Sequence, residues 1–122
     1  LSLLDWLFKQ KKDNPIYGYT QSLFSGLTTN ELSNIIIDIM AKSIFLKGIY
    51  HISGYPISKF DLLCKVKKLY NLYLRITKDS SIVISRILDD RLFRSITLYP
   101  KTNWDNMLYA MHNEDKSLWT VE

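Results

Sequence analysis

Residues 58–76 read SKFDLLCKVKKLYNLYLRI and contain the clearest helix signal in the chain. Ser58 and Asp61 have the spacing of a capping box, in which two polar side chains satisfy free N–H groups at the start of a helix. The stretch therefore predicts a helix from Ser58 to about Ile76. Its apolar side chains recur every three or four residues and form one stripe: Leu62, Val66, Leu69, Tyr70 and Tyr73.

Downstream of this helix the sequence predicts a hairpin and a final helix. Two β-rich runs, Ile82–Leu88 and Leu92–Tyr99, are separated by three polar residues. This spacing predicts an antiparallel hairpin, although the loop lacks the glycine of the strongest hairpin signals. A cap at Thr102 predicts a short helix, and residues 118–121 are expected to add an edge strand.

Upstream, the pattern predicts a helix and then a strand. A capping box at Thr28 opens a run with apolar residues at helical spacing, and its β-branched centre, Ile35–Ile37, leaves a strand as the alternative. The segment Ile44–Ile52 alternates with the period of a strand. A short helix is expected from Ser2, and the Pro- and Gly-containing residues 13–30 are expected to form a linker.

The order helix, helix, strand, helix, hairpin, helix favours an α+β fold over repeated βαβ units. We expect a single domain with a small antiparallel sheet and helices packed on one side. Residues 1–30 would form an N-terminal amphiphilic helix and a flexible arm, and residues 31–122 the compact α+β domain. A chain of 122 residues is long enough to bury such a core.

The composition is that of a mildly basic globular protein, with 47% apolar residues, 23% charged residues and a net charge of +4. This charge favours acidic partners. The single cysteine, Cys64, excludes an internal disulfide and a thiolate zinc cage, and it favours a reducing compartment. We expect neither a transmembrane segment nor secretion, because apolar runs are short and the basic cluster follows the first of them.

Few residues carry the usual chemistry of an active site. His51 and His112 lack a second metal ligand at helical spacing, and Cys64 lacks a neighbouring histidine. Asp89 and Asp90 suit a turn as well as acid–base work. The sequence also lacks a phosphate-binding glycine loop, a dinucleotide fingerprint and a nucleophile elbow. We therefore expect a binding protein that is not an enzyme, with no catalytic residue, cofactor or metal.

Three features favour binding to an anionic assembly. Apolar residues beside a basic cluster at the chain start suit a membrane anchor, or a helix that docks on its own domain. Basic residues on helix 58–76 suit phosphate contact, or a solvated face. Pro15 and Tyr17 suit a docking peptide, or a plain turn. The candidate anchors are Leu3, Leu4, Trp6, Leu7 and Phe8, and the candidate anion-binding residues are Lys9, Lys11, Lys12, Lys65, Lys68 and Arg75.

Residues 44–88, together with the basic N-terminal arm, resemble the matrix proteins of rhabdoviruses. The shared order is a strand over Ile44–Ile52, a Ser-Gly-Tyr-Pro turn, a helix with tyrosines near its end and an apolar strand over Ile82–Leu88. Matrix proteins of this family coat the inner face of the membrane, self-associate and condense the nucleocapsid. A Pro-Pro-x-Tyr segment in them recruits host budding factors, and Asn14 stands here where the first of those prolines would be.

The resemblance implies a viral matrix-like structural protein of the virion and host cytoplasm, on the inner face of the membrane. Its partners would be a second copy of the chain, anionic lipid, the nucleocapsid or nucleic-acid phosphate, and host budding factors. The alternative is a nucleic-acid-binding or phage assembly module, because the opening Leu3–Phe8 also resembles the start of phage portal proteins.

Replacing Lys9, Lys11 and Lys12 by Ala should abolish flotation of the protein with anionic liposomes at low salt, because each basic residue near the surface contributes about 1 kcal/mol. Neutral liposomes are the control. A wild-type protein that stays at the bottom of the gradient, or a triple variant that floats as well as the wild type, would contradict the membrane role.

Overall fold

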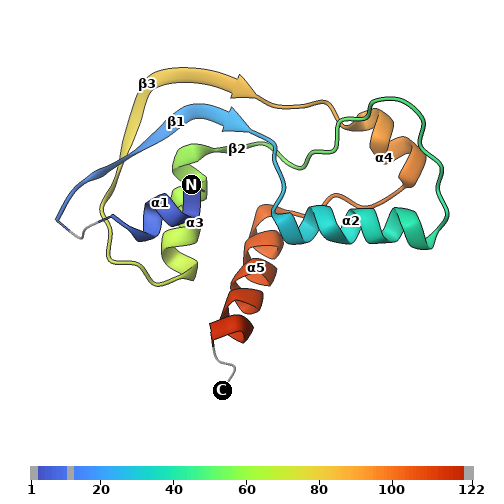
Figure 1. The fold of residues 1–122 in the computed structure, drawn as a ribbon. Coiled ribbons are helices and arrows are strands. Elements are labelled where there is room, and N and C mark those ends of the chain that lie inside the picture. Colours follow the sequence, from blue (N-terminus) through green and yellow to red (C-terminus); the bar gives the residue numbers. More distant parts are fainter. Residues whose placement is uncertain (1–2, 11–12, 120–122) are drawn as a thin grey trace.

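The computed structural model describes residues 3–10 and 13–119, which form one α+β domain, and this confirms the predicted fold class (Figure 1). None of the described helices is long and apolar enough to cross a membrane. The elements along the described chain are α1 (Leu3–Phe8), β1 (Ile16–Phe24), α2 (Thr29–Ala41), β2 (Ile57–Ser58), α3 (Lys59–Leu69), β3 (Ile76–Arg86), α4 (Arg91–Thr97) and α5 (Trp104–Trp119).

The sheet has three strands in the order β2-β1-β3. The central strand, β1, pairs in parallel with β3, with a register shift between Tyr19 and Gln21, and pairs antiparallel with the short β2. The sheet is therefore mixed, whereas the sequence predicted an antiparallel one. A parallel pair needs a long crossover, and residues 25–75, which include α2 and α3, supply it.

The predicted helix starts are confirmed at α2 and α3. The hydroxyl of Thr28 accepts a hydrogen bond from the N–H of Glu31 at 3.2 Å, and that of Ser58 accepts one from Asp61 at 3.1 Å. The helix α3 ends at Leu69, earlier than predicted. Soon after its end Asn71 adopts a positive φ of 54°, a conformation that breaks the helical path.

The strand β1 lies within the segment that the sequence predicted as a linker, residues 13–30. Its local signal is weak because glycine, threonine and serine interrupt its apolar residues. Gly18 is required for packing, since a Cβ at this position would lie 2.6 Å from the Cδ1 atom of the Phe60 ring. The helix α3 therefore approaches β1 closely only because residue 18 lacks a side chain.

The first run of the predicted hairpin, Ile82–Leu88, falls largely within β3, but the hairpin itself is wrong, and so is the strand predicted over Ile44–Ile52. Residues 91–97 form the helix α4, in which the Nε of Arg94 donates to Asp90 at 2.9 Å, an i,i+4 ion pair that suits a helical turn. Residues 44–52 form no strand. Leu118 and Trp119 extend α5, and the rest of the edge strand predicted there lies outside the described residues.

The hydrophobic core lies between α1, α3, α5 and one face of the sheet. Leu63, Val66 and Met107 are almost fully buried in it, and Leu7 of α1 is 0% exposed. The opening helix thus docks on its own domain, which is one of the two interpretations that the sequence left open.

Leu7→Ala should lower the free energy of unfolding by about 2–5 kcal/mol, because deletion of a buried leucine side chain leaves a cavity. Tyr73→Ala is the control, since Tyr73 is 73% exposed. Urea unfolding followed by circular dichroism measures both variants. A loss at Leu7 no larger than that at Tyr73 would show that α1 does not contribute to the core.

Candidate functional site

A pocket of about 370 Å³ opens where the parallel strands β1 and β3 end. Ligands commonly bind at the carboxyl ends of parallel strands, because the connecting loops leave the sheet there. The apolar lining residues are Leu3, Leu23, Phe24, Ile52 and Leu88. The polar lining residues are Ser22, Ser25, Ser53, Lys59 and Arg86.

The pocket carries two positive charges, and its lining contains no carboxylate. Lys59 is the first residue of α3, and Arg86 is the last residue of β3. Within the part of the chain that the structure describes, neither of them forms an ion pair. The Nζ of Lys59 lies 5.7 Å from the centroid of the Tyr19 ring, so its side chain rests on β1. The arrangement suits a bound anion.

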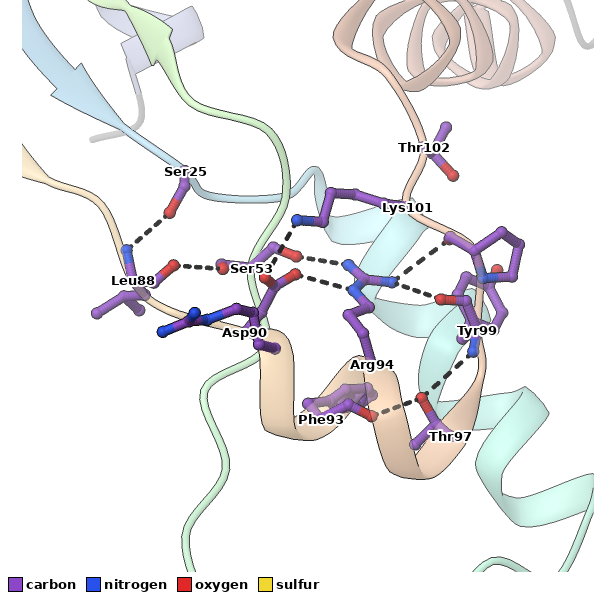
Figure 2. A network of polar contacts seen from close by, with 12 residues as sticks. Ser25, Ser53, Leu88, Asp90, Phe93, Arg94, Thr97, Tyr99, Lys101 and Thr102 are labelled. Atoms are coloured by element: carbon purple, nitrogen blue, oxygen red, sulfur yellow. Dashed lines mark hydrogen bonds and ion pairs between the residues drawn. The ribbon is translucent and has the colours of Figure 1, made fainter.

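One wall of the pocket is held by hydrogen bonds between segments that are distant in the sequence (Figure 2). The N–H of Leu88 donates to the hydroxyl of Ser25 at 2.9 Å, and the hydroxyl of Ser53 donates to the carbonyl of Leu88 at 3.0 Å. Ser25 and Ser53 are both buried. These contacts join the ends of β1 and β3 to the segment that precedes β2.

Arg94 of α4 connects this wall to the rest of the domain. Its guanidinium donates to the carbonyl oxygens of Ser53 and Tyr99 and to the carboxylate of Asp90. Lys101 donates to the second oxygen of Asp90 at 3.1 Å. Burial raises the pKa of Asp90, but the hydrogen bonds and charges of Arg94 and Lys101 outweigh it, so the pKa lies below its ordinary value. The buried carboxylate is charged, and each of its two oxygens accepts a hydrogen bond from a cation.

A larger pocket of about 570 Å³ lies beside α3, but a carboxylate lines it and one of its two lysines is already in an ion pair. Lys65 pairs with Asp105 at 2.6 Å, and Lys78 lies over the ring of Phe60, 5.4 Å from its centroid. The carboxylate of Asp61 also lines this pocket. The smaller pocket between Lys59 and Arg86 is therefore the better candidate for an anion.

The predicted membrane anchors divide between the core and the surface. Leu7 is buried, and Leu3 and Leu4 are half-buried and pack against the core. Trp6 and Phe8 are 36% and 45% exposed. Membrane insertion by this helix stays a prediction, and four of the five proposed anchors already pack on the domain, since Phe8 also contacts the ring of Tyr70.

The basic residues predicted to share one face of helix 58–76 do not all lie on a helix. Lys65 and Lys68 belong to α3, whereas Arg75 lies between α3 and β3. Lys65 and Lys68 line a third pocket together with Asp105, the ion-pair partner of Lys65. Arg75 is exposed before β3, and its backbone carbonyl accepts a hydrogen bond from the N–H of Ile16. These residues lie outside the pocket between Lys59 and Arg86.

The remaining predicted residues belong to the start of the chain. Lys9 follows α1 and is exposed, whereas Lys11 and Lys12 lie outside the described residues. Pro15 precedes β1, and Tyr17 lies within β1 with 56% of its surface exposed. The predicted docking peptide is thus partly a strand of the sheet, and its role in docking stays a prediction.

Lys59, Arg86 and Ser22 were not among the site residues predicted from the sequence. No local motif marks them, because they lie on three different elements, α3, β3 and β1. A prediction that β1 pairs in parallel with β3 would have found them. This pairing places Ser22 of β1 in register with Ile84 of β3, close to Arg86 at the end of the same strand.

Comparison with known proteins identifies the fold. Neither a family model nor a curated protein matches the chain. A dTDP-4-dehydrorhamnose reductase from Clostridium acetobutylicum ATCC 824 matches with a TM-score of 0.75 and 11% identity over 99% of this chain and 45% of that one. The dTDP-4-dehydrorhamnose reductase from Bacillus anthracis str. Ames, in complex with NADP, matches with a TM-score of 0.71 and 16% identity. The match covers 91% of this chain and 40% of that one. A GDP-mannoheptose C4 reductase from Campylobacter jejuni, with NADP bound, matches with a TM-score of 0.61 and 18% identity. The match covers 84% of this chain and 34% of that one.

The chain spans less than half the length of these reductases, and at such identities the match shows a shared fold. The expectation that this protein is not an enzyme is corrected by this finding, since its fold is that of a part of known sugar reductases. The viral matrix-like role stays a prediction from the sequence, without support from these structural neighbours.

Asp90→Asn should lower the free energy of unfolding by about 3–5 kcal/mol near pH 7, because it leaves two partly buried cations without their carboxylate. Since folding lowers the pKa of Asp90, its contribution is present above the ordinary pKa of about 4 and is lost as the pH falls through the folded-state value. The difference in the free energy of unfolding between the wild type and Asp90→Asn should therefore become smaller in acid.

Urea unfolding at pH 7 and at pH 3 measures this difference. The matched control is Asp105→Asn, which removes the carboxylate of an exposed ion pair and should cost less than about 1 kcal/mol at pH 7. Equal losses for the two variants at pH 7 would show that the Asp90 network does not hold the domain together.

Proposed function

We propose that this chain is the sugar-nucleotide-binding part of a reductase that acts on nucleoside-diphosphate-linked sugars. The observation that carries the proposal is the pocket at the ends of β1 and β3, where Lys59 and Arg86 supply positive charge and no carboxylate opposes them. Support comes from the structural neighbours, which are named as reductases of a dTDP-linked and a GDP-linked sugar.

The chemistry of the lining fits a nucleoside diphosphate. A guanidinium such as that of Arg86 can donate two parallel N–H groups to a phosphate, while the ammonium of Lys59 acts as a compact positive charge. The pocket also has an apolar side, which includes Phe24 and Leu88. Rings of a base or a sugar can pack there while the phosphates meet the two cations.

The described residues do not form a dinucleotide site. The chain has four glycines, and none of them belongs to a G-x-G-x-x-G loop, whose backbone N–H groups hold a pyrophosphate. We therefore assign to this chain the binding and orientation of the sugar nucleotide and assign no hydride-transfer step to its residues.

Titration calorimetry of the chain with dTDP, GDP and inorganic pyrophosphate tests the proposal. Each should bind at low salt and bind less tightly as the salt concentration rises. Arg86→Ala and Lys59→Ala should each weaken binding at least about tenfold, because a hydrogen bond to a charged group contributes roughly 1.5–3 kcal/mol. Arg86→Lys should retain part of the affinity, since the charge remains and the second N–H contact is lost.

Lys68→Ala is the matched control. It removes the same charge from the same helix as Lys59→Ala, but Lys68 does not line the pocket. If Lys59→Ala and Lys68→Ala weaken binding equally, the attraction is diffuse and the pocket is not the site. A wild-type chain that binds neither dTDP nor GDP at millimolar concentration would also contradict the proposal.

A further inference from the structure

A pocket of about 290 Å³ lies at the edge of the hydrophobic core, between α1, α3 and α5. Its inner wall consists of buried side chains, since Leu7, Leu63 and Val66 are 0%, 0% and 1% exposed. Half-buried residues, among them Leu4 and Leu27, line the rest. Protein interiors rarely leave a space larger than a water molecule, because side chains that face a void lose contacts. A pocket of this size beside the core is therefore a candidate ligand site.

The lining of this pocket is almost wholly apolar. Eleven of its thirteen residues carry apolar side chains, the other two are Thr28 and Thr29, and the described lining contains no charged residue. The indole N–H of Trp104, which also lines the pocket, already donates to the carbonyl of Tyr55 at 2.8 Å. The hydroxyl of Thr28 accepts the cap hydrogen bond from the N–H of Glu31. A buried water molecule needs roughly two to four polar partners, so the lining favours an apolar molecule over water.

The apolar pocket is separate from the candidate anion site, although the two are neighbours. Leu3 and Phe24 line both pockets and form the wall between them. The ring of Phe24 packs on that of Trp104, with 5.5 Å between the centroids, which holds this wall in place. Lys59 and Arg86 line only the anion site. The two linings therefore select different ligands, an anion on one side of the wall and an uncharged molecule on the other.

We propose that the pocket between α1, α3 and α5 binds a small, neutral, hydrophobic molecule. An apolar cavity of about 150 Å³ has room for benzene, so a volume of about 290 Å³ accommodates roughly nine to twelve non-hydrogen atoms. A bicyclic aromatic compound or a medium-chain alcohol has this size. One hydroxyl group on such a molecule can meet the threonine side chains at the start of α2. This site is additional to the sugar-nucleotide pocket and does not depend on it.

Titration calorimetry with 2-naphthol, a neutral two-ring probe, tests the proposal. The charged analogue 2-naphthoate has the same rings and should bind at least about tenfold more weakly, because an unpaired charge is costly to bury. In methyl NMR spectra, 2-naphthol should shift the signals of Leu62, Leu63 and Met111, which line the pocket. Octan-1-ol should shift the same signals, whereas octanoate should not.

Leu4→Trp and Leu27→Trp should each weaken the binding of 2-naphthol at least about tenfold, because the larger side chain occupies the pocket. The two positions lie on different segments, α1 and the connection between β1 and α2, so each variant tests the site independently of the other. Leu92→Trp is the matched control, since Leu92 is 61% exposed on α4 and does not line the pocket. It should bind 2-naphthol like the wild type, and circular dichroism checks that every variant is folded.

A wild-type chain that does not bind 2-naphthol at millimolar concentration would overturn the proposal. Equal affinities for 2-naphthol and 2-naphthoate would do the same. So would Leu4→Trp and Leu27→Trp variants that bind as tightly as Leu92→Trp, because the probe would then sit on exposed apolar side chains outside the pocket. Methyl signals around the pocket that shift with the concentration of this chain alone would also overturn it, since the occupant would then be a second copy.

Discussion

The parallel pairing of β1 with β3 is the interaction on which the rest of the structure depends. It joins segments separated by the whole of α2, β2 and α3, and it turns a sequence interrupted by glycine and serine into the central strand of a sheet. The pairing also makes both strands end at the same edge. Lys59 and Arg86 meet there at one pocket, so the fold and the candidate site have the same origin.

Buried polar groups hold this edge in place. Ser25, Ser53 and Leu88 exchange hydrogen bonds across three segments, and Arg94 extends the network to the carboxylate of Asp90. A network of this kind is useful only if all its members are satisfied, because each unpaired buried group would be destabilising. The two cations of the network, Arg94 and Lys101, both pair with Asp90, whereas Lys59 and Arg86 at the pocket form no ion pair among the described residues. The charges of this network are thus separate from those of the candidate site.

The apolar side chains of the domain divide between a closed core and an exposed helix. The core is closed around α1, α3 and α5, while α2 and the segment after it expose large apolar side chains. The structural neighbours are more than twice as long as this chain.

The sequence by itself determined the features that depend on near neighbours. The caps at Thr28 and Ser58 are bonds between residues three positions apart, so the starts of α2 and α3 and the α+β class were predictable. Tertiary structure alone decided that residues 16–24 are a parallel strand and that Lys59 and Arg86 share a pocket. Their partners are distant in the chain, and no local pattern of side chains records a contact that forms only when the sheet closes.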